Sequence, residues 1–164
     1  EKSAYTIDYA DLYRKGYRGV IFDIDNTLVP HGAPATKEAA AFFASLRETG
    51  FSTCLLSNNQ KPRVAPFADA VGSIYIENAH KPSVKNYQEA CRRMGIKEEH
   101  AVFVGDQLFT DVYGAKRTGL YNILTEPINP KEEIQIVLKR YLEHIVLFFY
   151  ERDLARGRIT KKNS

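Results

Sequence analysis

Side chains suited to phosphate chemistry follow four apolar runs of the sequence. They are Asp23, Asp25 and Thr27 after the first run, Ser57 and Asn58 after the second, Lys81 after the third, and Asp106 and Asp111 after the fourth. In an open α/β sheet, sites form beyond the carboxyl ends of the strands. We therefore expect these residues to meet at one edge of a sheet, in a polar set that folding alone does not require.

The first two carboxylates predict a bound cation. Side chains two residues apart on a strand point to the same side, so Asp23 and Asp25 approach each other if the strand continues that far. Two like charges about 4 Å apart cost about 4 kcal/mol at an effective dielectric of 20, and Asp106 nearby adds to the repulsion. Mg²⁺ offsets such a cost, and it typically binds one or two carboxylates together with substrate phosphate and water. Lys81 supplies a second positive charge, so the sequence predicts a site for Mg²⁺ and a phosphorylated substrate.

Phosphoryl transfer follows from these groups. One carboxylate can attack phosphorus and form an aspartyl-phosphate, while a cation and a lysine stabilise charge on the phosphoryl oxygens. A second carboxylic acid must protonate the leaving oxygen and then accept a proton from water. Other roles stay open: Ser57 and Asn58 can cap a helix, and Asp111 can serve as an N-cap.

The elements that must position these residues alternate between strands and helices. We expect strands at 20–24, 51–56, 73–76, 101–104 and 120–124, and helices at 37–49, 62–70, 83–94 and 111–118. This alternation indicates βαβ units and a parallel, Rossmann-like sheet of the α/β class with helices on both faces. Tyr5, Tyr9 and Tyr13 recur every four residues in a short first helix, and we expect them to pack in the core.

The polar residues also resemble a known family. The segment Asp23-Ile24-Asp25-Asn26-Thr27-Leu28 resembles the DxDxT motif of the haloacid dehalogenase superfamily of phosphohydrolases. The second, third and fourth motifs of that superfamily are similar to Ser57, to Lys81 before Pro82, and to the segment 105–111. All four occur in order and together cover about residues 18–125.

The resemblance implies a role for each matching residue. Asp23 would be the nucleophile and Asp25 the general acid and base, while Ser57 and Lys81 would bind the phosphoryl group. Mg²⁺ would be held by Asp23, the carbonyl of Asp25 and Asp106, with support from Asp111. Thr27 would orient the loop after the nucleophile and, with Asn58, contact the substrate.

A narrower resemblance points to the YqeG-type branch of subfamily IIIA, which includes phosphatidylglycerophosphate phosphatases. It rests on DNTLVP, LLSNN and GDQLFTD, followed by an apolar helical C-terminal segment. Neither the gap 29–56 nor the gap 58–80 has room for a cap domain, so we expect an open site. Such a site suits a large or surface-displayed substrate. A phosphatase of a soluble phosphometabolite or phosphoprotein, or a non-catalytic scaffold, is the alternative.

Composition predicts one domain and gives no sign of nucleic-acid binding. The chain has 164 residues and a formal charge of +3. The tail 151–164 holds five basic and two acidic residues, which leaves residues 1–150 neutral. We therefore expect a single domain over 1–150 and a basic, flexible tail. Only two cysteines are present and no run is long enough to span a membrane, which favours a cytoplasmic setting.

The last predicted helix follows Pro130 and carries a wide apolar stripe. Its apolar residues recur at helical spacing and end in the apolar run 145–150. Such an excess of apolar surface predicts a homodimer interface or peripheral contact with a membrane.

Overall fold

The sheet has the parallel α/β architecture predicted from the sequence. The structure, a computed structural model, describes residues 1–130. Five parallel strands lie in the order β3-β2-β1-β4-β5. Their bounds are β1 Gly19–Phe22, β2 Ser52–Leu56, β3 Ile74–Ile76, β4 Ala101–Gly105 and β5 Tyr121–Leu124. The chain order reverses direction at β1 and β4, so their carboxyl ends form the crevice in which this class of fold places its sites.

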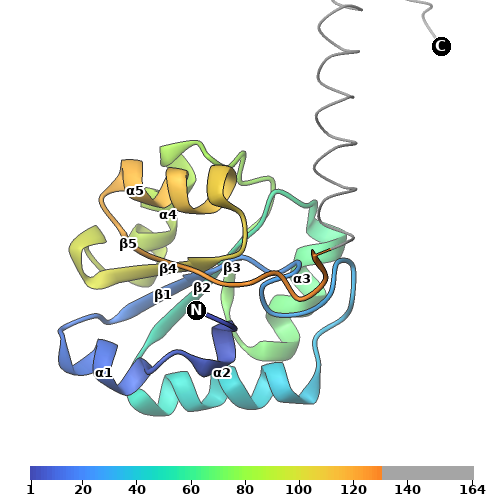
Figure 1. Ribbon diagram of the computed structural model, residues 1–164, viewed down its shortest axis with the longest axis horizontal. Coiled ribbons are helices and arrows are strands. Elements are labelled where there is room, and N and C mark those ends of the chain that lie inside the picture. The colour runs from blue at the N-terminus through green and yellow to red at the C-terminus, as the bar shows by residue number, and fades with distance from the viewer. Residues whose placement is uncertain (131–164) are drawn as a thin grey trace, which may run out of the picture. The chain divides into compact units, whose positions relative to one another are not determined.

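Helices cover both faces of this sheet. Figure 1 shows α1, α2 and α3 below the strands and α4 and α5 above them. Their bounds are α1 Tyr9–Arg14, α2 Lys37–Thr49, α3 Lys61–Val71, α4 Val84–Met94 and α5 Tyr113–Thr118. The connections from β1 to β2 and from β2 to β3 each contain a single helix among the described residues, with no inserted domain. The expected absence of a cap in these two gaps is therefore confirmed.

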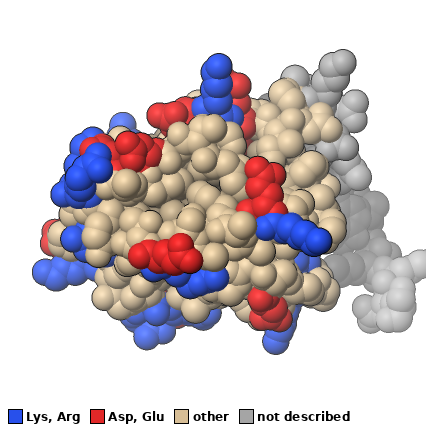
Figure 2. Space-filling model, turned by 90° about the horizontal axis from the view of Figure 1, so that it is seen from below, with Lys and Arg blue, Asp and Glu red and all other residues tan. Residues whose placement is uncertain are grey.

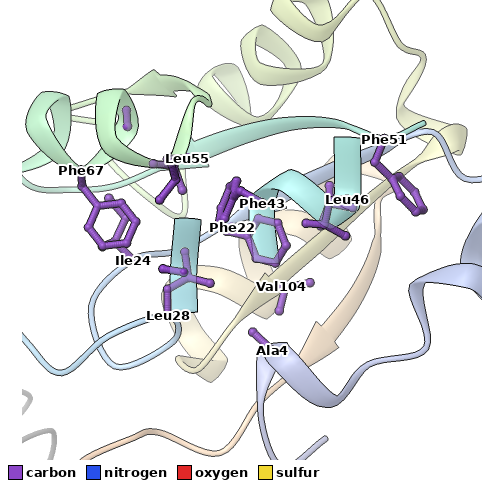
Figure 3. Packing of buried hydrophobic residues seen from close by; sticks show 14 of the residues in the cluster. Ala4, Phe22, Ile24, Leu28, Phe43, Leu46, Phe51, Leu55, Phe67 and Val104 are labelled. Carbon is purple, nitrogen blue, oxygen red and sulfur yellow. The ribbon is translucent and has the colours of Figure 1, made fainter. Parts of the chain in front are cut away.

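Alternating strand residues build two apolar layers. Val20 and Phe22 of β1 pack toward α2 and α3, whereas Ile21 packs toward α4 on the other face. Figure 3 shows Phe43 and Leu46 of α2 against the first layer, and the rings of Phe22 and Phe43 lie 5.2 Å apart. Every residue of β1 is buried, and Asp23 is the first residue after the strand.

Local signals set the boundaries of α2 as predicted. Thr36 caps its start, because the Thr36 side chain accepts a hydrogen bond from the Ala39 amide at 3.0 Å. Gly50 ends it in the left-handed conformation, with φ of 103°. A Cβ atom at Gly50 would also lie 2.8 Å from the Tyr13 hydroxyl, so only glycine fits the close approach of α1.

The three N-terminal tyrosines pack on the core as predicted, Tyr9 within it and Tyr5 and Tyr13 against it, but they do not share one helix. Tyr5 lies in a 3-10 turn, Ala4–Thr6, and α1 begins only at Tyr9. The ring of Tyr9 lies 6.3 Å from that of Phe22, and the ring of Tyr13 lies 5.4 Å from that of Phe51. The Tyr5 hydroxyl donates a 2.7 Å hydrogen bond to the carbonyl of Leu28. The N-terminal segment therefore braces the loop that follows Asp23.

Surface charge is mixed on the face that Figure 2 shows. Basic and acidic side chains are interspersed there, with wide uncharged areas between them. This pattern agrees with the neutral composition of residues 1–150, and the lack of nucleic-acid binding stays a prediction. In residues 1–130, no helix combines the length and apolar character needed to cross a membrane. The predicted C-terminal helix, its dimer or membrane contact and the basic tail lie outside the described residues.

The two thiols predict a simple probe of folding. Cys54 and Cys91 are both buried, and burial raises the pKa of each thiol to about 12. Because the thiolate is the reactive form, native protein should react negligibly with a disulfide reagent such as DTNB at mildly alkaline pH. Protein in guanidinium chloride should release two equivalents per chain, measured by absorbance. Rapid reaction of either thiol in native protein would contradict the packing described here.

Candidate active site

A lysine bridges two carboxylates at the carboxyl edge of the sheet. Lys81 Nζ lies 2.6 Å from Asp23 Oδ1 and 2.6 Å from Asp111 Oδ1. Asp23 follows β1, and its amide donates to the Val104 carbonyl at 3.0 Å, which places it beside the end of β4. All three charged side chains are buried. The predicted meeting of the first, third and fourth strand ends is therefore present in the structure.

The buried carboxylates outnumber the cation that faces them. Asp23, Asp106 and Asp111 each offer an oxygen, and these oxygens lie within 4.8 Å of one another. Burial raises the pKa of Asp23 to about 7; the ammonium of Lys81 opposes this shift, and the carboxylates of Asp111 and Asp25 add to it. Burial alone would lower the pKa of Lys81, but Asp111 and Asp23 outweigh it and raise that pKa. Three carboxylates with one lysine leave a negative site whose hard oxygen donors fit a divalent cation such as Mg²⁺.

Neighbouring residues hold Asp106 and Asp111 in place. The Thr27 hydroxyl donates a 2.9 Å hydrogen bond to Asp106 Oδ1. The Gln107 amide donates to Asp111 Oδ2 at 3.1 Å, so Asp111 also closes the turn after β4. A Cβ atom at Gly105 would lie 2.5 Å from the same oxygen, and glycine is therefore required there. Thr27 thus orients a carboxylate of the cluster, and its contact with substrate stays a prediction.

The helix predicted to start at Asp111 begins differently. A π-helical turn over Leu108–Val112 precedes α5. This wider turn accommodates Asp111 while its carboxylate reaches Lys81 and the Gln107 amide. The Tyr87 hydroxyl, under the turn, donates to the Thr110 carbonyl at 2.6 Å. Sequence reasoning missed Tyr87. Its position on α4, the helix that follows Lys81, could have indicated that it lies near the site.

Asp25 lies in a second environment, apart from the three-carboxylate cluster. β1 ends at Phe22, before Asp25, and Asn26 turns the chain with φ of 62°. Asp25 Oδ1 accepts from the Gly32 amide at 2.7 Å and from Arg63 at 2.8 Å, and Oδ2 accepts from the Asn59 side chain at 2.6 Å. The strand therefore does not continue to Asp25, which was the condition for Asp23 and Asp25 to point to the same side. The Asp25 side chain faces the Arg63 guanidinium and is not one of the three clustered carboxylates.

Arg63 is the charged residue that sequence reasoning missed. It lies in the first turn of α3, the helix that follows Ser57, and thus at the same edge of the sheet. That position was the available signal, but the pattern of residues did not show that the side chain reaches back to Asp25.

Ser57 and Asn58 occupy the turn after β2. Ser57 is buried, and its hydroxyl accepts a 3.1 Å hydrogen bond from the Asn59 amide. Asn58 accepts from the Lys81 amide at 2.7 Å and donates to the Lys81 carbonyl at 3.4 Å. The Asn58 side chain therefore holds the backbone of Lys81 through two hydrogen bonds. Neither side chain caps α3, whose N-cap Gln60 makes no side-chain hydrogen bond.

Loss of the lysine should destabilise the fold measurably. Lys81→Met leaves Asp23 and Asp111 buried without their cation, which should lower the free energy of unfolding by about 3–5 kcal/mol. Urea denaturation measures this value. Lys85→Met, at an exposed lysine on α4, is the control and should have little effect. Equal stability of the two variants would show that Lys81 does not neutralise the cluster.

Comparison with known proteins agrees with this geometry. A family model described as haloacid dehalogenase-like hydrolase matches residues 32–119, which include Ser57, Lys81, Asp106 and Asp111. The chain is also similar to a crystal structure of an uncharacterized protein from Corynebacterium glutamicum, with a TM-score of 0.57 and 23% identity, over 74% of this chain and 93% of that one. At this identity the likeness shows the fold alone.

Two curated relatives are similar over most of the chain. The probable phosphatase YqeG of Bacillus subtilis is 34% identical over 152 residues, which cover 92% of this chain and 88% of that protein. Phosphatidylglycerophosphate phosphatase 1, chloroplastic/mitochondrial, of Arabidopsis thaliana is 29% identical over 92% of this chain and 46% of its own length. With the family match and the arrangement of carboxylates and lysine at the sheet edge, these likenesses show that the chain belongs to the haloacid dehalogenase-like hydrolases.

Proposed function

We propose that the protein is a Mg²⁺-dependent phosphomonoesterase that works through an aspartyl-phosphate on Asp23. The observation that carries this proposal is the contact of Lys81 with Asp23 and Asp111 inside a three-carboxylate cluster. A phosphoryl group beside Asp23 would there find a nucleophile and a lysine together. The relatives that are named phosphatases support the same reaction class.

The carboxylate cluster suits a divalent cation. Asp23, Asp106 and Asp111 would hold Mg²⁺, together with the backbone carbonyl of Asp25. When bound, the ion supplies positive charge to the transferring phosphoryl oxygens.

The protein's own residues account for the proton and bond changes. A carboxylate oxygen of Asp23 attacks phosphorus as the bond to the leaving oxygen breaks, and Asp25 donates a proton to that oxygen. Asp25 then accepts a proton from water, whose oxygen attacks the aspartyl-phosphate and releases inorganic phosphate. The Lys81 ammonium and the Ser57 hydroxyl bind the phosphoryl oxygens through both steps.

The openness of the site suggests a large or surface-displayed substrate. No cap domain interrupts either connection at the site, so the bulk of the substrate must exclude water from the reaction. A phospholipid headgroup meets this requirement, and the similarity to a phosphatidylglycerophosphate phosphatase favours that lipid. A soluble phosphometabolite would need closure by a second copy of the chain.

An exposed apolar rim beside the site supports contact with lipid. Leu108 and Phe109, in the turn that carries Asp111, are 57% and 80% exposed, and Tyr113 is 53% exposed. Lys116 and Arg117 follow on α5 and are also exposed. Apolar tips flanked by basic side chains suit the interface of an anionic membrane. The protein would therefore bind peripherally to a membrane, from the cytoplasm in the setting predicted above.

Replacement of the nucleophile tests the reaction. Asp23→Asn should reduce hydrolysis of 4-nitrophenyl phosphate at least about a thousandfold, because an amide cannot form the aspartyl-phosphate. Asp69→Asn, at an exposed carboxylate on α3, should retain activity. Fluoroberyllate with Mg²⁺ should raise the thermal midpoint of wild-type protein and leave that of Asp23→Asn unchanged. Full activity of Asp23→Asn would exclude this nucleophile, and a wild type without activity or shift would favour a scaffold.

Vesicle binding tests the apolar rim. The double variant Leu108→Ser, Phe109→Ser should bind phosphatidylglycerol vesicles at least about tenfold more weakly than wild type in co-sedimentation, because it loses two side chains that would enter the lipid. Ile74→Ser, on the edge strand β3 and 40% exposed, is the matched control and should bind as wild type does. Equal binding by all three proteins would remove the rim from the proposal.

A further inference from the structure

A groove lies along α3 and the loop that contains Gly32, Pro34 and Ala35. It has a volume of about 310 Å³ and is lined by Gly32, Pro34, Ala35, Pro62, Arg63, Pro66, Phe67 and Ala70. Two of these residues also hold the Asp25 carboxylate: the Gly32 amide at 2.7 Å and Arg63 at 2.8 Å, both on Oδ1. Through these two residues the groove is adjacent to the Asp25 carboxylate. We refer to these eight residues as the Arg63 groove.

This position is where a leaving alcohol must lie if Asp25 is the acid. The attacking and leaving oxygens lie roughly in line across phosphorus, so the leaving oxygen points away from Asp23. The acid must be within hydrogen-bond reach of that oxygen. Atoms attached to the leaving oxygen then start beside Asp25 and continue into the Arg63 groove.

The lining of the groove restricts what those atoms can be. Arg63 is the only lining residue with a polar side chain, and the others are glycine, alanine, proline and phenylalanine. A sugar would bring several hydroxyls to a wall that offers no other side-chain partner, and buried hydroxyls without partners are costly. Proline walls are also stiff, so the groove is largely preformed for aliphatic carbon.

Arg63 has binding capacity that its present contacts do not use. Its side chain is 20% exposed, and its guanidinium lies 5.6 Å from the centre of the Phe67 ring. Arg63 Nε is buried and has no hydrogen-bond partner within residues 1–130. A guanidinium binds phosphate oxygens through two parallel N–H donors, a geometry that the contact with one oxygen of Asp25 does not satisfy.

We propose that the Arg63 groove binds the leaving alcohol of a phospholipid substrate, and that Arg63 binds a second phosphate, a diester, in that alcohol. The inference rests on the proposed phosphatase function. The diester would draw Arg63 from Asp25 Oδ1 and leave that oxygen to contact the leaving oxygen. At about 310 Å³ the groove is at the lower end of small-molecule sites, so it would take the linker and the first methylenes of one chain.

Three substrates test the role of Arg63. They are 4-nitrophenyl phosphate, which has no diester; dihexanoyl phosphatidylglycerophosphate, which has a diester and short chains; and its deacylated form, which keeps only the diester. Arg63→Gln should lower kcat/KM for both diester substrates, relative to the aryl phosphate, by roughly 10- to 100-fold. Lys61→Gln removes the same charge two residues away, outside the groove, and should leave all ratios unchanged.

A second variant tests the apolar wall. Ala70→Leu would fill part of the groove and should lower kcat/KM for the dihexanoyl substrate about tenfold relative to the deacylated one. Ala41→Leu, at an exposed position on α2, is the matched control. An Ala70→Leu ratio equal to that of wild type would overturn the lipid assignment and indicate a soluble diester.

The outcomes separate this inference from the proposed function. Equal losses on all three substrates in Arg63→Gln would show that Arg63 acts only through Asp25, which overturns the inference and leaves the phosphatase proposal intact. A wild type that hydrolyses none of the three would overturn both.

Discussion

The site depends on the repulsion among buried carboxylates gathered at one point. Asp23, Asp106 and Asp111 place their oxygens within 4.8 Å of one another, and Lys81 supplies one positive charge among them. Removing such charges from water is costly, so the arrangement persists only because packing and hydrogen bonds fix each group. Because folding has already brought these charges together, the site has a strong electric field that suits a cation and a phosphate.

Asp23 and Asp25 are close in sequence, but the fold gives their carboxylates different surroundings. Asp23 faces a lysine and two further carboxylates, whereas Asp25 faces a guanidinium, two neutral donors and, at 3.9 Å, the ring of His31. This division suits two roles in one reaction, since a nucleophile and a proton carrier need unlike environments. The chain leaves the strand before Asp25 and turns at Asn26, and the Asp25 carboxylate reaches Arg63 on α3.

The sequence was most informative where side-chain types recur at the ends of strands. The apolar runs predicted the sheet, and the residues after them predicted the meeting of Asp23, Lys81, Asp106 and Asp111. The sequence was less informative where a long side chain contacts a residue far away in the chain. The reach of Arg63 to Asp25 depends on how α3 packs, and the surroundings of Asp25 depend on where β1 ends and the chain turns. The π-helical turn likewise follows from contacts of Asp111 that no local pattern encodes.

The hydrogen bonds of Asn58 have a consequence for how the site meets its ligand. The Asn58 side chain hydrogen-bonds to both the N–H and the carbonyl of Lys81. It therefore joins the loop that follows β2 to the loop that follows β3. Ser57 and Lys81, which the proposed mechanism assigns to the phosphoryl oxygens, therefore lie on loops that are already tied to each other without a ligand. An aspartate at position 58 would be nearly isosteric with asparagine but would lack the donor for the Lys81 carbonyl. It would therefore lose that hydrogen bond while preserving the shape of the side chain.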